Sequence, residues 1–126
     1  MALTMDTISL GEIAHARSGD KGNHANIFVV AYTRAGYNFL LRELTAELVA
    51  AQFADLGCTH VERYEMGLVD SLNFVLYNAL AGGASRSLRI DTQGKLLGTA
   101  ILELQLPAPS DEALRNMLPE QEPDYF

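Results

Sequence analysis

The stretch NIFVVAYT, residues 26–33, is the part of the sequence that decides the expected fold. Its run of four consecutive apolar residues is typical of a buried strand that is covered on both faces. Residues 6–16 predict another strand, kinked at Gly11, where the alternation of apolar residues changes phase. The polar segment between them, residues 15–26, is predicted to be a loop.

Two further segments carry apolar residues at helical spacing. Residues 39–55 predict an amphipathic helix, which Gly57 would end as a C-cap. Residues 72–80 predict a second helix, with Asp70 or Ser71 as its N-cap. Each helix has one apolar side, which must be buried against another element.

The remaining regular elements are predicted to be strands. Residues 60–66 alternate between polar and apolar side chains, as a half-buried strand does. The turn DTQGK, residues 91–95, predicts a hairpin between residues 85–91 and 95–106. The resulting order is β-β-α-β-α-β-β. The economical arrangement is an α+β two-layer sandwich, with both helices on one side of an antiparallel or mixed sheet.

Length and charge exclude several classes of protein. The chain has 126 residues, enough for one domain, which we place at residues 1–110, followed by an acidic tail at 111–126. Two alternatives stay open for the tail, a short helix around residues 113–118 or a loose segment. A net charge of −7 argues against a nucleic-acid partner. The longest apolar run is too short to span a membrane. A single cysteine, Cys58, agrees with a cytoplasmic location.

The polar segment 15–26 has the composition of an anion-binding turn. Gly19 and Gly22 allow backbone conformations that expose N–H groups, and Arg17 and Lys21 add positive charge. A phosphate or a carboxylate would suit such a turn. The glycine and lysine spacing of a P-loop, G-x-x-x-x-G-K-S/T, is absent, so the segment does not indicate a nucleoside triphosphate site.

Two alternatives stay open for this segment. In the first it is a structural turn, in which Asp20 and Asn26 satisfy backbone groups. In the second, His15, Asp20 and His24 are metal ligands, but no cysteine or glutamate completes the set. We expect neither a metal nor a cofactor.

The segment GGASR, residues 82–86, again combines glycines, a serine and a base. The purely structural interpretation of this segment is an edge strand, whose charged side chains prevent pairing with a strand of another molecule. We expect it to meet the polar segment in one anion site, because both follow or precede a regular element, where backbone N–H groups are free. The expected ligand-binding residues are His15, Arg17, Ser18, Gly19, Asp20, Lys21, Gly22, Asn26, Gly83 and Arg86.

Four blocks of the sequence together resemble a known family. They are IAHARSGDKGNHANI, VERYEM, LNFVLYNALAGGASRSLRID and GKLLGTAILELQL. The chain resembles the small ferredoxin-fold domain of the AtuA family, named for acyclic terpene utilisation, as a stand-alone version. The resemblance implies an α+β ferredoxin-like fold and an association with acyl-CoA and terpenoid or branched-acid catabolism.

Two function classes follow. The first is a small non-catalytic binding or accessory subunit, which takes a CoA ester or carboxylate or docks onto a larger AtuA-like partner. The second is a small enzyme acting on an acyl-CoA or a related carboxylic acid, with His15 or Asp20 as base and Arg17 or Lys21 as oxyanion partner. A two-layer sandwich leaves one sheet face open, so we also expect a homo-oligomer, most simply a two-fold dimer.

Overall fold

The computed structural model describes residues 6–21, 24–58, 60–78 and 95–119. Its centre is a four-stranded antiparallel sheet in the order β2-β3-β5-β4. The outer strands β2 and β4 are therefore far apart in the sheet. The bounds of the strands are Ala14–Lys21 for β2, His24–Ala31 for β3, His60–Met66 for β4 and Ser71–Tyr77 for β5.

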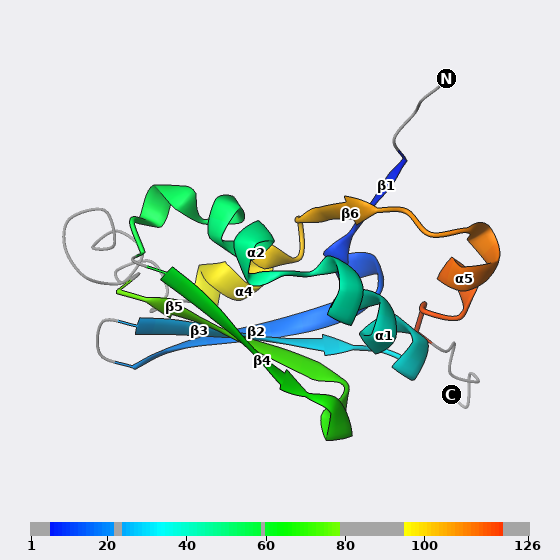
Figure 1. The fold of residues 1–126 in the computed structure, drawn as a ribbon, viewed down its shortest axis with the longest axis horizontal. Coiled ribbons are helices and arrows are strands. Elements are labelled where there is room, and N and C mark those ends of the chain that lie inside the picture. The colour runs from blue at the N-terminus through cyan, green and yellow to red at the C-terminus, as the bar shows by residue number, and fades with distance from the viewer. Residues whose placement is uncertain (1–5, 22–23, 59, 79–94, 120–126) are drawn as a thin grey trace, which may run out of the picture.

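A helical layer covers one side of this sheet. Figure 1 shows α1 (Arg34–Glu43), α2 (Ala46–Gln52) and α4 (Lys95–Ile101) on the same side. A small sheet, β1 (Thr7–Ser9) paired with β6 (Gln105–Pro107), lies on that side as well. The antiparallel sheet, the one-sided helices and the α+β layered class are confirmed.

The alternation of burial along β3 distinguishes the two sides of the sheet. Ala25, Ile27 and Val29 are buried, whereas Asn26 and Phe28 between them are only half-buried. The expectation that this strand is covered on both faces is therefore wrong for the described part. The open face carries His15, Arg17, Gly19, His24, Asn26, Phe28, Val30, His60, Glu62, Tyr64, Met66, Asn73, Val75 and Tyr77.

The single kinked strand predicted for residues 6–16 is wrong, because the chain forms two strands in two different sheets. A 3-10 turn, Leu10–Glu12, separates β1 from β2. Gly11 lies in this turn, and its backbone N–H donates to the carbonyl of Leu102 at 2.9 Å. A Cβ at Gly11 would lie 3.3 Å from that same carbonyl oxygen, so the change of phase marks a close approach of two backbones.

The loop predicted for residues 15–26 is also wrong. Residues 15–21 and 24–26 belong to the paired strands β2 and β3, which are in register up to Lys21 opposite His24, whereas residues 22–23 lie outside the described residues. Strand β2 is at the edge of the sheet, and an edge strand with one open face accommodates polar side chains. The high polarity of this segment therefore reflects its position at an open sheet edge and does not indicate a loop.

The helix predicted for residues 39–55 begins earlier and is divided in two. Helix α1 begins after Thr33, whose Oγ1 accepts from the Gly36 N–H at 2.9 Å. Helix α2 begins after Thr45, whose Oγ1 accepts from the Leu48 N–H at 3.1 Å. Gly57, with φ of 71°, ends the following 3-10 turn, Ala54–Leu56, so the expected glycine stop is confirmed one turn beyond the helix.

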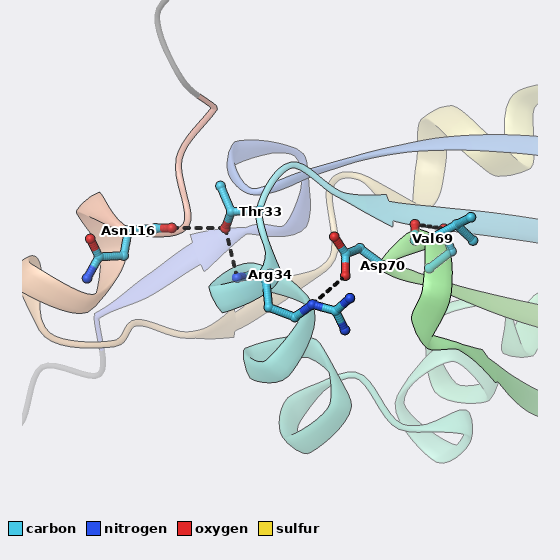
Figure 2. A network of polar contacts seen from close by, with 7 residues as sticks. Thr33, Arg34, Val69, Asp70 and Asn116 are labelled. Carbon is cyan, nitrogen blue, oxygen red and sulfur yellow. Dashed lines mark hydrogen bonds and ion pairs between the residues drawn. The ribbon is translucent and has the colours of Figure 1, made fainter.

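The second helix, predicted for residues 72–80, is wrong because Ser71–Tyr77 form strand β5, while residues 79–80 lie outside the described residues. Asp70 is not an N-cap but the left-handed residue (φ 53°) that ends the 3-10 turn Gly67–Val69. Figure 2 shows how the turn is held: Arg34 Nε of α1 lies 3.0 Å from the Asp70 carboxylate. The Ser71 hydroxyl donates to the Val69 carbonyl at 2.8 Å.

The predicted C-terminal hairpin is wrong in its second half. Residues 85–91 lie outside the described residues, whereas 95–101 form helix α4 and only Gln105–Pro107 form a strand. Helix α4 lies against β2, where the Gly98 N–H donates to Ser18 Oγ at 3.0 Å. The short helix expected in the tail is α5, Asp111–Arg115.

Arg63 of β4 joins the sheet to the helical layer. Its Nη1 donates to the carbonyls of Leu41 at 3.1 Å and Leu44 at 2.9 Å, at the end of α1. Its Nη2 forms an ion pair with Glu65 at 2.9 Å. The terminal carbonyls of a helix have no partner within the helix, so a guanidinium on the covered face satisfies two of them.

We therefore expect Arg63→Met to lower the free energy of unfolding by about 2–3 kcal/mol, the range for lost hydrogen bonds from a charged donor. Urea unfolding followed by circular dichroism would measure this change. Arg42→Met is the matched control: this arginine is exposed on α1, and we expect a loss below about 1 kcal/mol. Equal losses in the two variants would contradict the role given to Arg63.

Candidate functional site

The open face of the sheet contains a shallow cavity of about 360 Å³, the open-face cavity. It lies over β3 and β5, at the end of the sheet where β3 begins. None of the described residues that line it is acidic. The lining residues are His24, Ala25, Asn26, Asn73, Val75 and Tyr77.

Hydrogen bonds fix the orientation of the polar groups in this cavity. The Asn78 backbone N–H donates to His24 Nδ1 at 2.9 Å, so a neutral His24 ring carries its proton on Nε2. Asn26 Nδ2 donates to Asn73 Oδ1 at 3.4 Å. These bonds leave two donors unused, His24 Nε2 in the neutral ring and the side-chain amide Nδ2 of Asn73. They also leave one acceptor unused, Asn26 Oδ1.

A second cavity, of about 390 Å³, lies beside β2 where α4 packs against it. We call it the edge cavity. Arg17 is exposed and makes no hydrogen bond or ion pair with any residue that the structure describes. By contrast, Arg34 and Arg63 are both ion-paired. The edge cavity is lined by Ala16, Arg17, Ser18, Gly98 and Thr99.

Gly19 lies on β2 between the residues that line the two cavities. It is paired with Asn26 across the strands, and a Cβ at this position would lie 3.4 Å from Asn26 Oδ1. A glycine within a strand weakens the strand and often marks a close approach of another group. Here the missing side chain of Gly19 leaves the side-chain amide oxygen of Asn26, Oδ1, uncovered on the side that faces β2.

A cluster of hydrogen bonds around Glu62 borders the open-face cavity on the β4 side. The phenols of Tyr64 and Tyr77 both donate to Glu62 Oε1, the latter at 3.2 Å. His60 Nε2 lies 3.4 Å from Glu62 Oε2, and the His60 ring stacks on Tyr77 with centroids 4.2 Å apart. Tyr77 therefore belongs both to this cluster and to the cavity wall.

These contacts change two pKa values. The Tyr64 hydrogen bond, supported by Tyr77 and His60 and opposed by partial desolvation, holds the pKa of the Glu62 carboxyl below its usual range. The same carboxylate raises the pKa of Tyr64, because loss of the phenol proton would place two negative charges in contact. Glu62 is therefore a carboxylate and Tyr64 a neutral phenol near neutral pH.

The structure separates the predicted site residues into groups. Arg17 and Ser18 line the edge cavity, and Asn26 lines the open-face cavity. His15 lies near the opposite end of β2, with its ring 5.6 Å from that of Tyr32. Asp20 and Lys21 are part of β2 by their backbones, and their side chains lie outside the described residues.

Part of the expected site cannot be placed in this arrangement. Gly22, Gly83 and Arg86 lie outside the described residues, so the meeting of residues 15–26 with 82–86 stays a prediction. The two-fold dimer also stays a prediction. The alternative metal set is divided, because His15 pairs with Val30 and His24 with Lys21, at opposite ends of β2 and β3.

The sequence interpretation considered His24 only as a metal ligand and did not assign Asn73, Tyr77 or the Glu62 cluster to a binding site. For the residues of β5, the signal is an alternation of side chains with a period of two residues. Asn73, Val75 and Tyr77 alternate with buried residues along this strand. The helical interpretation of residues 72–80 concealed this alternation.

Comparison with known proteins identifies the family of the chain. A family model described as the AtuA ferredoxin-like domain matches residues 8–107. The chain belongs to this family. The match to the AtuA ferredoxin-like domain extends from β1 to β6 and includes both cavities, whereas α5 follows it. No curated protein and no solved structure shows significant similarity to the chain.

None of the helices in the described part of the chain has the length and apolar character needed to cross a membrane. Among the same residues, no group of three or more histidine, cysteine, aspartate or glutamate side chains is placed to hold a metal ion.

The pKa of Glu62 gives a testable prediction. We expect Tyr64→Phe to raise this pKa toward its ordinary value, because the largest cause of the lowering is removed. Since the folded-state pKa is depressed, the cluster stabilises the fold fully above the unfolded-state pKa, and this contribution is lost as pH falls through the folded-state pKa.

A carbon-detected NMR titration of the Glu62 carboxyl would measure the shift. Tyr32→Phe is the control, since Tyr32 is also exposed but lies outside the cluster. An unchanged Glu62 pKa in Tyr64→Phe would show that the phenol is not its main partner.

Proposed function

We propose that this protein is a small non-catalytic binding or accessory subunit linked to acyl-CoA and terpenoid or branched-acid catabolism. In this proposal its ligand carries a carboxylate or a phosphate, which Arg17 binds on the open face of β2, next to the edge cavity. Membership of the AtuA ferredoxin-like family supports the metabolic context. A larger AtuA-like protein is the partner that we propose for the accessory role.

The observation that carries the proposal is the exposed, unpaired state of Arg17 within the described residues. A guanidinium presents several N–H donors in a plane, which matches the oxygens of a carboxylate or phosphate. None of the described residues that line the edge cavity beside Arg17 is acidic, so none of them opposes a negative ligand.

Binding of small anions tests the proposal directly. We expect Arg17→Leu to weaken binding by about 1.5–3 kcal/mol, the range for a charge-assisted hydrogen bond, without loss of the fold. Thermal shift and calorimetric titration would compare acetyl-CoA, isovalerate and inorganic phosphate, so that a whole CoA ester, a branched carboxylate and the free phosphate ion are separate arms.

Arg42→Leu is the matched control, because it removes one exposed arginine from a helix outside both cavities. Equal weakening in the two variants would mean that only the overall charge matters. Absence of binding in all three arms would contradict the anion site.

One observation favours the second candidate function, a small enzyme acting on an acyl-CoA or a related carboxylic acid. Glu62 faces His60 Nε2, which leaves Nδ1 of a neutral ring as a proton acceptor close to the open-face cavity. In this candidate His60 is the general base, in place of His15 or Asp20.

The two candidates differ in a simple measurement. If the chain is an enzyme, the isolated protein turns over a branched acyl-CoA such as isovaleryl-CoA, and His60→Gln lowers kcat by about 100-fold or more, as loss of a general base does. His15→Gln, at the opposite end of β2, should leave kcat unchanged. No turnover by the wild-type protein would contradict this candidate and leave the binding subunit.

A further inference from the structure

We infer that the open-face cavity binds a part of the ligand that carries a hydrogen-bond donor, so that the ligand is an anion with a hydroxyl or N–H group several atoms from its charge. This inference rests on the proposed function, because Arg17 holds the charged group. It adds a requirement on the uncharged part of the ligand, which the anion site alone does not set.

The orientation of Asn26 is the first step. Its Nδ2 is committed to Asn73 Oδ1, so its Oδ1 is turned the other way, toward β2. Within the described residues this oxygen receives no hydrogen bond from the protein. It lies at a cavity wall and is half-buried, so a ligand that brings a donor supplies the missing partner.

Gly19 is the second step. Any other residue at this position would place its Cβ 3.4 Å from Asn26 Oδ1, and a branched side chain would cover that oxygen. Strands favour β-branched residues and disfavour glycine. Gly19 therefore keeps the acceptor accessible at the point where β2 separates the two cavities.

The position of Arg17 is the third step. Arg17 and Gly19 are two residues apart on the same face of β2, so Arg17 is a diagonal neighbour of Asn26. Diagonal neighbours in an antiparallel pair lie about 7–8 Å apart. A ligand of a few bonds can therefore reach both the guanidinium and the amide oxygen.

Charge decides which end of the ligand lies at β2. The Glu62 carboxylate lies on β4 beyond Val75 and opposes an anion over that edge of the sheet, whereas Arg17 favours one at β2. The charged end of the ligand therefore lies at Arg17, and the end with the hydrogen-bond donor lies at Asn26 Oδ1.

Matched pairs of acids isolate this contact. The pairs are 4-hydroxybutanoate with pentanoate, 5-hydroxypentanoate with hexanoate, and 6-hydroxyhexanoate with heptanoate. In each pair a methyl group replaces the hydroxyl, and the series covers the spacing between Arg17 and Asn26. We expect the hydroxy acid of at least one pair to bind about fivefold more tightly, as one added neutral hydrogen bond predicts.

Two variants test the assignment to Asn26. In Asn26→Leu, which lacks the acceptor, and in Gly19→Val, which covers it, the preference should fall to about one while the alkyl acid still binds. Asn38→Leu, an exposed position on α1, is the control and should keep the preference. Protein-detected NMR titration gives both the affinities and a check of the fold.

The outcomes separate this inference from the proposed function. Binding of both acids with equal affinity, or a preference that survives in Asn26→Leu, overturns the inference and leaves the anion site intact. Failure of every acid to bind, or binding unaffected by Arg17→Leu, overturns the proposed function and this inference with it.

Discussion

The register of β3 against its two neighbours is the constraint on which the rest of the structure depends. This strand pairs with β2 on one side and β5 on the other, and the helical layer covers only one face of the sheet. A shift of one residue would turn Ile27 and Val29 outward and Asn26 inward, away from its cavity. The burial of the apolar residues therefore fixes the positions of the polar ones, and the two cavities are consequences of core packing.

The open face also carries its positive and negative charges on opposite edge strands. Arg17 lies on the edge strand β2, Glu62 lies on the opposite edge strand β4, and neutral amides and rings lie between them. Because Glu62 accepts hydrogen bonds from two phenols, its charge is held in place near neutral pH. A molecule lying across this face would therefore meet different chemistry at its two ends, and this difference would fix its direction on the sheet.

Layer architecture could be predicted from the sequence, whereas several elements could not. The apolar run at 27–30 and the alternation at 60–66 identified two of the four central strands, and the family resemblance indicated the fold class. Residues 72–80 satisfy both a helical and a strand periodicity, and only pairing with β3 and β4 on both sides decides between them. Arg17 and Asn26 were predicted as site residues, but the Glu62 cluster depends on cross-strand register, which sequence spacing does not contain.

The contact between α4 and β2 also determines how the edge cavity can be observed. Gly98 packs so closely that a Cβ would lie 3.2 Å from Ser18 Oγ, and its own N–H donates to that oxygen. Glycine amides resonate in an uncrowded region of a nitrogen–proton correlation spectrum. The Gly98 signal is therefore a natural reporter, situated in the wall of the edge cavity, that senses any movement of Ser18 without an added label on a side chain.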